Sequence, residues 1–210
     1  MKYEKFQEDL KNILDSMGKS GKIFQNECQF QFDLAWAIKD QLKLDVKFEV
    51  VTIGDKKEYT DLAVLNDDGE FIAIELKYKT DAAVINGVSL LRHSAGDLGC
   101  YDFWHDVERL QKLYGKSISN VLEGRKCVGG FALMMTNDSW YWNKQRKHST
   151  AQYYPFRLVD REVTDKKLSW NLKYRCKDIE LNPPYVLKWE EYYTDQKNCM
   201  KYLLLPVNKK

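Results

Sequence analysis

The chain has 210 residues and a net charge of +2, and 44% of its residues are hydrophobic and 30% charged, which fits a single domain over 1–210 with a substantial core and excludes a disordered or collagen-like chain. Five scattered cysteines without a Cys-x-x-Cys pair argue against a disulfide framework or a zinc site. No stretch reaches the roughly 18 to 20 apolar residues of a membrane span, and the first residues do not resemble a signal peptide, so the sequence predicts a cytoplasmic protein with no membrane partner.

Two helices are predicted at the start of the chain. Apolar residues from Tyr3 to Met17 recur at steps of three and four and stop before Gly18, which predicts a helix that ends at a glycine. Asn26 can cap a second helix together with Gln29, and this helix should run to about residue 42. Its residues are apolar over most of the circumference, so we expect the second helix to be substantially buried.

The periodicity then changes to that of strands. The segments 46–53, 59–65 and 70–79 are rich in β-branched and aromatic residues and predict three strands. The stretch 80–99 is mostly polar and contains several glycines, which predicts a long loop. Because long loops in small domains are often functional, this one is a candidate part of a binding site.

A helix over 101–114 and a buried strand over 128–136 follow the loop. Apolar residues at helical spacing predict the buried side of the helix, namely Trp104, Val107, Leu110 and Leu113. Further strands or short helices are expected around Phe156, Trp170, Val186 and Leu203. The alternation of helices and strands predicts an α/β fold with a central mixed sheet flanked by helices.

The second and third strands form the most informative part of the sequence. Asp67, Asp68 and Gly69 predict a three-residue turn that ends with a glycine in the left-handed region. Such a turn places Asn66 opposite Glu70 and thereby fixes the register of the whole hairpin. The register pairs Leu65 with Phe71, Ala63 with Ala73, and Asp61 with Glu75.

This register brings three charged side chains together. Strand alternation puts Glu75 and Lys77 on the same side as Asp61. Directly opposed Cβ atoms lie roughly 5 Å apart, and two carboxylates at that distance repel by about 3 kcal/mol at an effective dielectric near 20. A bound divalent cation such as Mg²⁺ would offset the repulsion, since it favours one or two carboxylates together with waters and phosphates.

The hairpin resembles the core motif of the PD-(D/E)XK nuclease superfamily, which includes restriction endonucleases and DNA-repair nucleases. The matching residues are Asp61 and Glu75-Leu76-Lys77, and Glu27 matches the Glu that the family often carries on its first core helix. The order of a helix, three strands, a helix and a strand over about 26–136 is also similar to the core of the family. Thr60 stands where the family usually has Pro.

The resemblance implies a restriction-endonuclease-like core and a metal-dependent hydrolase that cleaves phosphodiester bonds in DNA. It implies that Asp61, Glu75 and the carbonyl of Leu76 hold Mg²⁺, or Mn²⁺ in its place. Lys77 would orient the attacking water or stabilise the charge that develops on the phosphate, and Glu27 would bind the metal or a water. A homodimer would fit cleavage of both strands of a duplex.

Nucleic-acid contacts are expected in three places. Arg92 and His93 lie in the predicted loop, and Arg109 shares one helix face with Asp102 and Asp106, where it contacts nucleic acid or forms intrahelical ion pairs. The third place is the segment of about 140–177, called here the basic flank, because residues 142–177 carry a net charge of +7 while 1–141 carry −5. Cations alternate there with aromatic rings, which suits phosphates and unpaired bases, and its leading candidates are Lys144, Arg146 and Lys147.

Two other interpretations of the same residues stay open. In the first, the fold has lost hydrolysis and only binds nucleic acid, DNA more readily than RNA, or a protein. In the second, the chain is a structural or interaction domain in which Lys77 neutralises Asp61 and Glu75 in an ion-pair cluster. For Glu27, the alternative is a simple role at the first turn of a helix, where a carboxylate complements the helix dipole.

Overall fold

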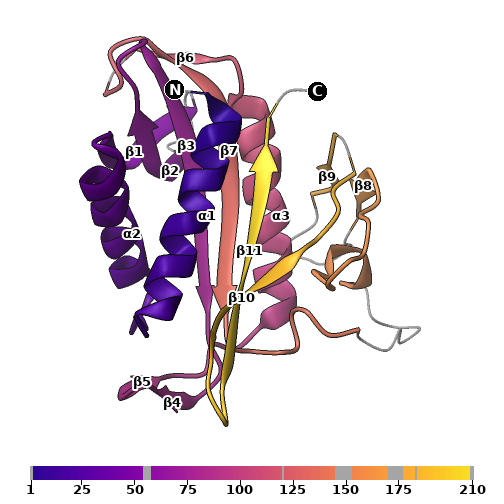
Figure 1. The fold of residues 1–210 in the computed structure, drawn as a ribbon. Coiled ribbons are helices and arrows are strands. Elements are labelled where there is room, and N and C mark those ends of the chain that lie inside the picture. Colours follow the sequence, from indigo (N-terminus) through magenta and orange to yellow (C-terminus); the bar gives the residue numbers. More distant parts are fainter. Residues whose placement is uncertain are drawn as a thin grey trace.

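The computed structural model describes residues 2–53, 58–119, 121–144, 153–169, 177–182 and 184–208. It is an α/β structure in which a mixed sheet of seven strands is flanked by three α-helices, as predicted (Figure 1). In the described part of the chain, no helix is both long and apolar enough to cross a membrane.

The sheet has the order β1-β2-β3-β7-β11-β10, and the short β6 pairs with β7. Neighbouring strands are antiparallel except for β3 and β7, which run parallel and therefore need a crossover, made here by β4, β5 and α3. The strands are β1 (Asp45–Ile53), β2 (Glu58–Leu65), β3 (Glu70–Lys79), β6 (Ser117–Ile118), β7 (Arg125–Thr136), β10 (Trp189–Thr194) and β11 (Cys199–Val207).

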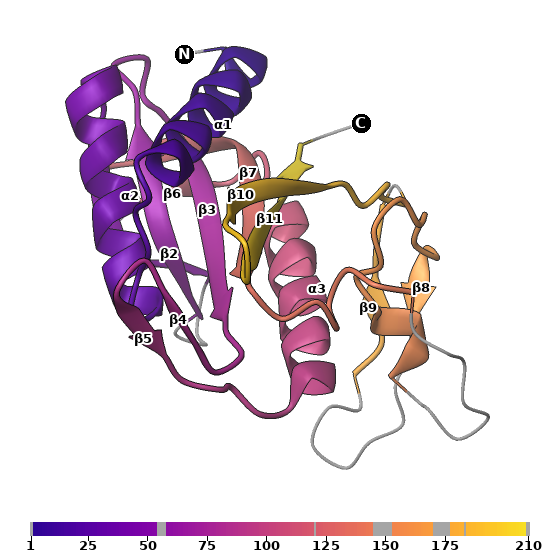
Figure 2. The same ribbon diagram turned by 60° about the horizontal axis from the view of Figure 1, so that its bottom comes forward.

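Helices cover both faces of the sheet (Figures 1 and 2). α1 (Tyr3–Lys19) and α2 (Glu27–Leu42) lie on one face, and α3 (Gly96–Leu113) lies on the other. Strand alternation divides β3 between the two layers: Ile72, Ile74 and Leu76 pack with α1 and α2, whereas Phe71 and Ala73 pack with α3. The two layers thus form separate cores on either side of one strand.

The predicted start of α2 is confirmed, but its predicted burial is wrong in part. The Asn26 side chain accepts a hydrogen bond from the Gln29 N–H at 2.8 Å, which satisfies one of the free donors of the first turn. Phe30 is fully buried against the sheet. Phe32 and Trp36 are 57% and 64% exposed, because they point away from the sheet and only one side of an outer helix meets the core.

The segment 80–99, predicted to be a long loop, contains a β-hairpin and the first residues of α3. β4 (Ala83–Ile85) and β5 (Val88–Leu90) pair as a hairpin around Asn86 and Gly87, which have φ angles of 47° and 80°. Asn-Gly between apolar residues favours this turn because both positions need positive φ. α3 then begins at Gly96, ahead of the predicted start near residue 101, and its four predicted apolar residues are buried.

The C-terminal strands extend the sheet beyond the segment that carries the motif. β11 pairs with β7, and β10 pairs with β11 at the edge. The basic flank includes the 3₁₀ turn Tyr154–Phe156 and the short strand β8 (Lys167–Leu168), which pairs with β9 (Ile179–Glu180) just after the flank. Its backbone is tied to the core because the Trp104 indole N–H donates to the Phe156 carbonyl at 2.9 Å. Trp170 lies outside the described residues.

Candidate functional site

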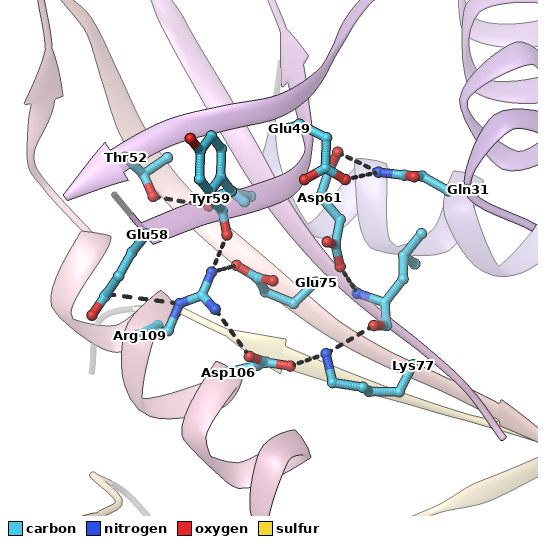
Figure 3. Close-up of polar contacts among 12 residues, drawn as sticks. Gln31, Glu49, Thr52, Glu58, Tyr59, Asp61, Glu75, Lys77, Asp106 and Arg109 are labelled. Atoms are coloured by element: carbon cyan, nitrogen blue, oxygen red, sulfur yellow. Dashed lines mark hydrogen bonds and ion pairs between the residues drawn. The ribbon is translucent and has the colours of Figure 1, made fainter. Parts of the chain in front are cut away.

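The hairpin register predicted from the turn is confirmed for residues 62–65 and 71–74, whereas the predicted pair of Asp61 with Glu75 lies beyond the paired ladder. Leu65 pairs with Phe71 and Ala63 with Ala73, and Gly69 has a φ angle of 73°. The backbone pairing of β2 with β3 ends at the pair of Leu62 with Ile74, next to Asp61. There the Asp61 carboxylate accepts a hydrogen bond from the Leu76 N–H at 2.6 Å (Figure 3). A side chain thus replaces the backbone ladder at the point where the two strands separate.

Asp61 lines a pocket of about 520 Å³ between the start of α2 and the strands β1, β2 and β3. Two further carboxylates, those of Glu27 and Glu49, line this pocket together with Leu76 and His93. Here the term acidic pocket refers to the space lined by Glu27, Glu49 and Asp61. Its oxygen-rich lining is the chemistry that hard divalent cations prefer.

Glu27 joins α2 to the motif strand. It is the first residue of the helix, and its carboxylate accepts a hydrogen bond from the Tyr78 N–H at 2.7 Å. Tyr78 directly follows Lys77 in β3. The structure therefore places Glu27 beside the predicted motif, in addition to any interaction with the helix dipole.

Glu49 and Gln31 also line the pocket, although the sequence does not predict them as site residues. The Gln31 side-chain amide donates to the Glu49 carboxylate at 3.0 Å and to the Asp61 carbonyl oxygen at 2.8 Å (Figure 3). Glu49 has a φ angle of 47° inside β1, an irregularity that lets its side chain leave the normal strand alternation. In the register of β1 against β2, Phe48 pairs with Leu62 and Val50 with Thr60, so Glu49 lies between these pairs, across from Asp61.

Glu75 does not line the acidic pocket with Asp61, contrary to the prediction that these two carboxylates and Lys77 converge on one patch; its side chain contacts α3 instead. Its side chain is 3% exposed, and its carboxylate lies 2.7 Å from the Arg109 guanidinium. Arg109 also lies 3.2 Å from Asp106 and 3.9 Å from Glu58, and it donates to the Tyr59 carbonyl oxygen. The guanidinium is therefore enclosed by acceptors from β2, β3 and α3 (Figure 3).

Lys77 is held by the same helix. Its ammonium lies 2.5 Å from the Asp106 carboxylate and donates to the Leu76 carbonyl oxygen at 3.1 Å. Glu75, Arg109, Asp106 and Lys77 thus alternate in charge in one continuous chain of contacts, called here the buried ion network. Their side chains are at most 20% exposed.

Burial shifts the pKa values of the motif residues. Burial raises the pKa of Asp61 to about 6, and the Leu76 N–H and the Lys77 charge offset only part of this effect. Burial and the negative charges of Asp106 and Asp61 raise the pKa of Glu75 well above its ordinary value. Burial alone would lower the pKa of Lys77, but the charge and hydrogen bond of Asp106 outweigh it and raise that pKa.

The local charges do not balance. Asp61, Glu75 and Asp106 are three carboxylates, whereas Arg109 and Lys77 supply two cations. Glu75 and Asp106 each have a cation within 2.7 Å, but Asp61 forms no ion pair with any described residue. When all five groups are ionised, the uncompensated negative charge lies at Asp61, on the side of the acidic pocket.

The other predicted contact residues are more scattered. Arg92 is largely exposed and forms an ion pair with Asp81 at 2.7 Å. His93 lines the acidic pocket and accepts a hydrogen bond from the Thr80 N–H at 3.0 Å, and burial together with the Lys79 charge lowers its pKa. Lys144 is exposed in the basic flank. Arg146 and Lys147 lie outside the described residues.

The oxygen donors that the structure describes around Asp61 are of the type that fits a hard divalent cation, but they do not lie close enough together to coordinate one. The Asp61, Glu27 and Glu49 carboxylates and the Leu76 carbonyl are all oxygen donors of the type that Mg²⁺ and Mn²⁺ prefer. In the part of the chain that the structure describes, no three His, Cys, Asp or Glu side chains are close enough together to hold a metal ion. Side chains around Asp61 would therefore have to converge on a cation as it binds.

Comparison with protein-family models, with curated proteins and with solved structures finds no match. The site therefore has to be interpreted from its own geometry and chemistry.

Proposed function

We propose that this protein is a metal-dependent nuclease that hydrolyses phosphodiester bonds in DNA, on a restriction-endonuclease-like core. The observation that carries the proposal is Asp61, a carboxylate without a cation partner among the described residues, whose pKa is raised to about 6 and which opens into the acidic pocket. A divalent cation is the missing counter-charge that such a group would take. The resemblance of Asp61, Glu75, Leu76 and Lys77 to the nuclease motif supports the same assignment.

The carboxylates of the acidic pocket, Leu76 and the neighbouring Lys77 have distinct roles in this proposal. Asp61, Glu27 and Glu49 and the Leu76 carbonyl would hold Mg²⁺ or Mn²⁺. The bound cation would polarise the phosphodiester and lower the pKa of a water molecule. Lys77, held beside the Leu76 carbonyl, would stabilise the negative charge that develops on the phosphate.

The basic flank supports a polyanionic substrate. It packs beside α3 through the 3₁₀ turn and β9, which follows it (Figure 2). Residues 142–177 carry a charge of +7, and cations there lie against rings, as Arg157 does 4.0 Å above the Tyr154 ring centre. Clustered cations attract a polyanion, so the flank is the proposed DNA-binding surface. It lies in the α3 layer, on the face of the sheet opposite α2, whose first residue lines the acidic pocket. A homodimer remains part of the proposal for cleavage of both strands.

The test is a cleavage assay on supercoiled DNA and on linear single- and double-stranded DNA and RNA, with Mg²⁺, Mn²⁺ or EDTA. We expect cleavage of DNA with either metal and none with EDTA. Asp61→Asn should reduce the rate at least about a hundredfold, because it removes charge where the metal binds but keeps the side-chain shape. Asp67→Asn, in the exposed hairpin turn, is the matched control and should cleave like the wild type. Equal cleavage by Asp61→Asn and wild type would refute the mechanism.

A second candidate function is a nucleic-acid-binding module without hydrolysis. The specific observation in its favour is that Glu75 and Lys77 already have protein partners, Arg109 and Asp106, within 2.7 Å. A nuclease motif satisfied in this way would not need a metal. Salt-dependent DNA binding without nicking of plasmid under any metal condition would select this function.

A further inference from the structure

Arg109 occupies an unusual position for an arginine. Its side chain is 17% exposed, and it projects from α3 into the space between β2 and β3. It contacts Glu75 at 2.7 Å, Asp106 at 3.2 Å and the Tyr59 carbonyl, with Glu58 at 3.9 Å. The guanidinium is thus surrounded by oxygen acceptors, much as a bound metal cation is surrounded by oxygen ligands.

The buried carboxylates explain why a cation is needed there. Glu75 and Asp106 are 3% and 6% exposed, and two such charges close together are costly unless a positive charge separates them. Lys77 compensates Asp106 from the other side, at 2.5 Å. Arg109 is therefore the group whose loss would leave Glu75 without a partner.

We infer that Arg109 is the resident cation of Glu75: it holds the Glu75 carboxylate on the α3 side of β3 and so competes with a divalent cation for it. The inference rests on the proposed function for the view that a metal binds at Asp61, and it adds a positioning residue that decides whether Glu75 joins Asp61 as a ligand. With Arg109 in place, a metal in the acidic pocket has Asp61 but not Glu75. With the guanidinium withdrawn, Glu75 is free to turn toward the metal, while Lys77 and Asp106 stay paired.

The direct test is Arg109→Gln, which removes the charge and keeps a shorter side chain that can still form hydrogen bonds. Mn²⁺ binding is measured by titration, with free Mn²⁺ followed by electron paramagnetic resonance. We expect Arg109→Gln to bind Mn²⁺ at least about tenfold more tightly than the wild type, a gain of about 1.4 kcal/mol. The double variant Arg109→Gln/Glu75→Gln should lose this gain, because the freed carboxylate is its source.

Lys112→Gln is the matched control, since Lys112 lies on the same helix, pairs with Glu108 at 2.6 Å and lies outside the buried ion network. It should leave Mn²⁺ affinity unchanged. Unchanged or weaker binding by Arg109→Gln, or a gain that survives in the double variant, would overturn the inference. If Arg109→Gln unfolds in EDTA, Mn²⁺ should restore its circular dichroism spectrum, and failure to do so also counts against the inference.

This readout is independent of catalysis. If the wild type does not cleave nucleic acid but Arg109→Gln gains Mn²⁺ affinity through Glu75, the proposed nuclease function fails and the inference stands. If the wild type cleaves and Arg109→Gln shows no gain, the inference fails and the nuclease function stands.

Discussion

The carboxylates on the two sides of β3 differ in burial and in whether a protein cation pairs with them. On the α3 side, Glu75 and Asp106 are nearly inaccessible, and each has a cation within 2.7 Å. On the pocket side, Asp61, Glu27 and Glu49 face an open space with no described Lys or Arg paired to Asp61. The buried carboxylates are thus paired with protein cations, although the Arg109 Nε–H has no hydrogen-bond acceptor among the described residues. Asp61, on the pocket side, has no such cation.

The difference separates stability from chemistry. A buried charge that has lost its partner is strongly destabilising, so the network on the α3 side holds the helix to the sheet. An unpaired charge beside solvent costs less and can still be satisfied by a ligand. Sequence neighbours in a single motif, such as Glu75 and Leu76, therefore contribute to different tasks.

The largest expected effect comes from breaking the buried side. Asp106→Ala removes the partner of Lys77 and one partner of Arg109, and we expect the free energy of unfolding to fall by about 3–5 kcal/mol. Urea denaturation measures this change. Asp40→Ala, which removes an exposed ion pair with Lys43 on α2, should be indistinguishable from the wild type. Similar small losses in both variants would show that the network does not hold α3.

The pocket side should show an intermediate effect that depends on pH. The folded-state pKa of Asp61, about 6, lies above its ordinary value of 3.8, so the folded state binds the proton more tightly. Stability from this group is complete below pH 3.8 and is lost as the pH rises through 6, by about 3 kcal/mol. Asp61→Asn, which cannot ionise, should remove this loss and be more stable than the wild type at pH 7.5.

Urea denaturation at pH 4 and at pH 7.5 checks that prediction, with Asp67→Asn as the control. Glu75 has a raised pKa as well, so a residual loss in the same direction is expected in the variant. An Asp61→Asn protein less stable than the wild type at pH 7.5 would mean that the Asp61 charge is already compensated. Added Mg²⁺ should stabilise the wild type but not the variant.

The smallest expected effect concerns His93 at the rim of the pocket. His93→Ala removes the acceptor of the Thr80 N–H, and a single partly exposed hydrogen bond contributes about 0.5–1 kcal/mol. Because the pKa of His93 is lowered, its contribution is present above the ordinary imidazole value and is lost as the pH falls through the lowered one. The difference in melting temperature between wild type and His93→Ala should thus shrink in mildly acidic buffer. A constant difference would exclude protonation of His93 as the cause.

The features that could be predicted from the sequence are local ones. The turn at Gly69 fixed the register from which Asp61 and Glu75 were placed as neighbours, and Asn26 marked the start of α2. The side chains that Glu75 and Lys77 contact were not predictable in this way. Arg109 lies 34 positions after Glu75, and only the packing of α3 shows that the two side chains pair.

Two other misses have physical reasons. Glu49 reaches the pocket through a positive φ angle within a strand, which no alternation pattern anticipates for a non-glycine residue. The apolar composition of α2 suggested burial, but composition does not say how many sides of a helix are covered, and Phe32 and Trp36 stay exposed. The β4–β5 hairpin, by contrast, had a readable signal in Asn86-Gly87.

The separation between Glu75 and Arg109 along the chain has a consequence for how the protein folds. The β2–β3 hairpin closes over a short turn, so its two acids can meet early, before any distant segment is in place. The guanidinium that stabilises Glu75 arrives only when α3 docks, and β3 gains its parallel neighbour only once β7 has been added. Until then the nascent hairpin carries acids that repel one another, and only Lys77, a proton or an ion from solution can offset their charge. When α3 docks, the Arg109 guanidinium takes the place of that proton or ion beside Glu75.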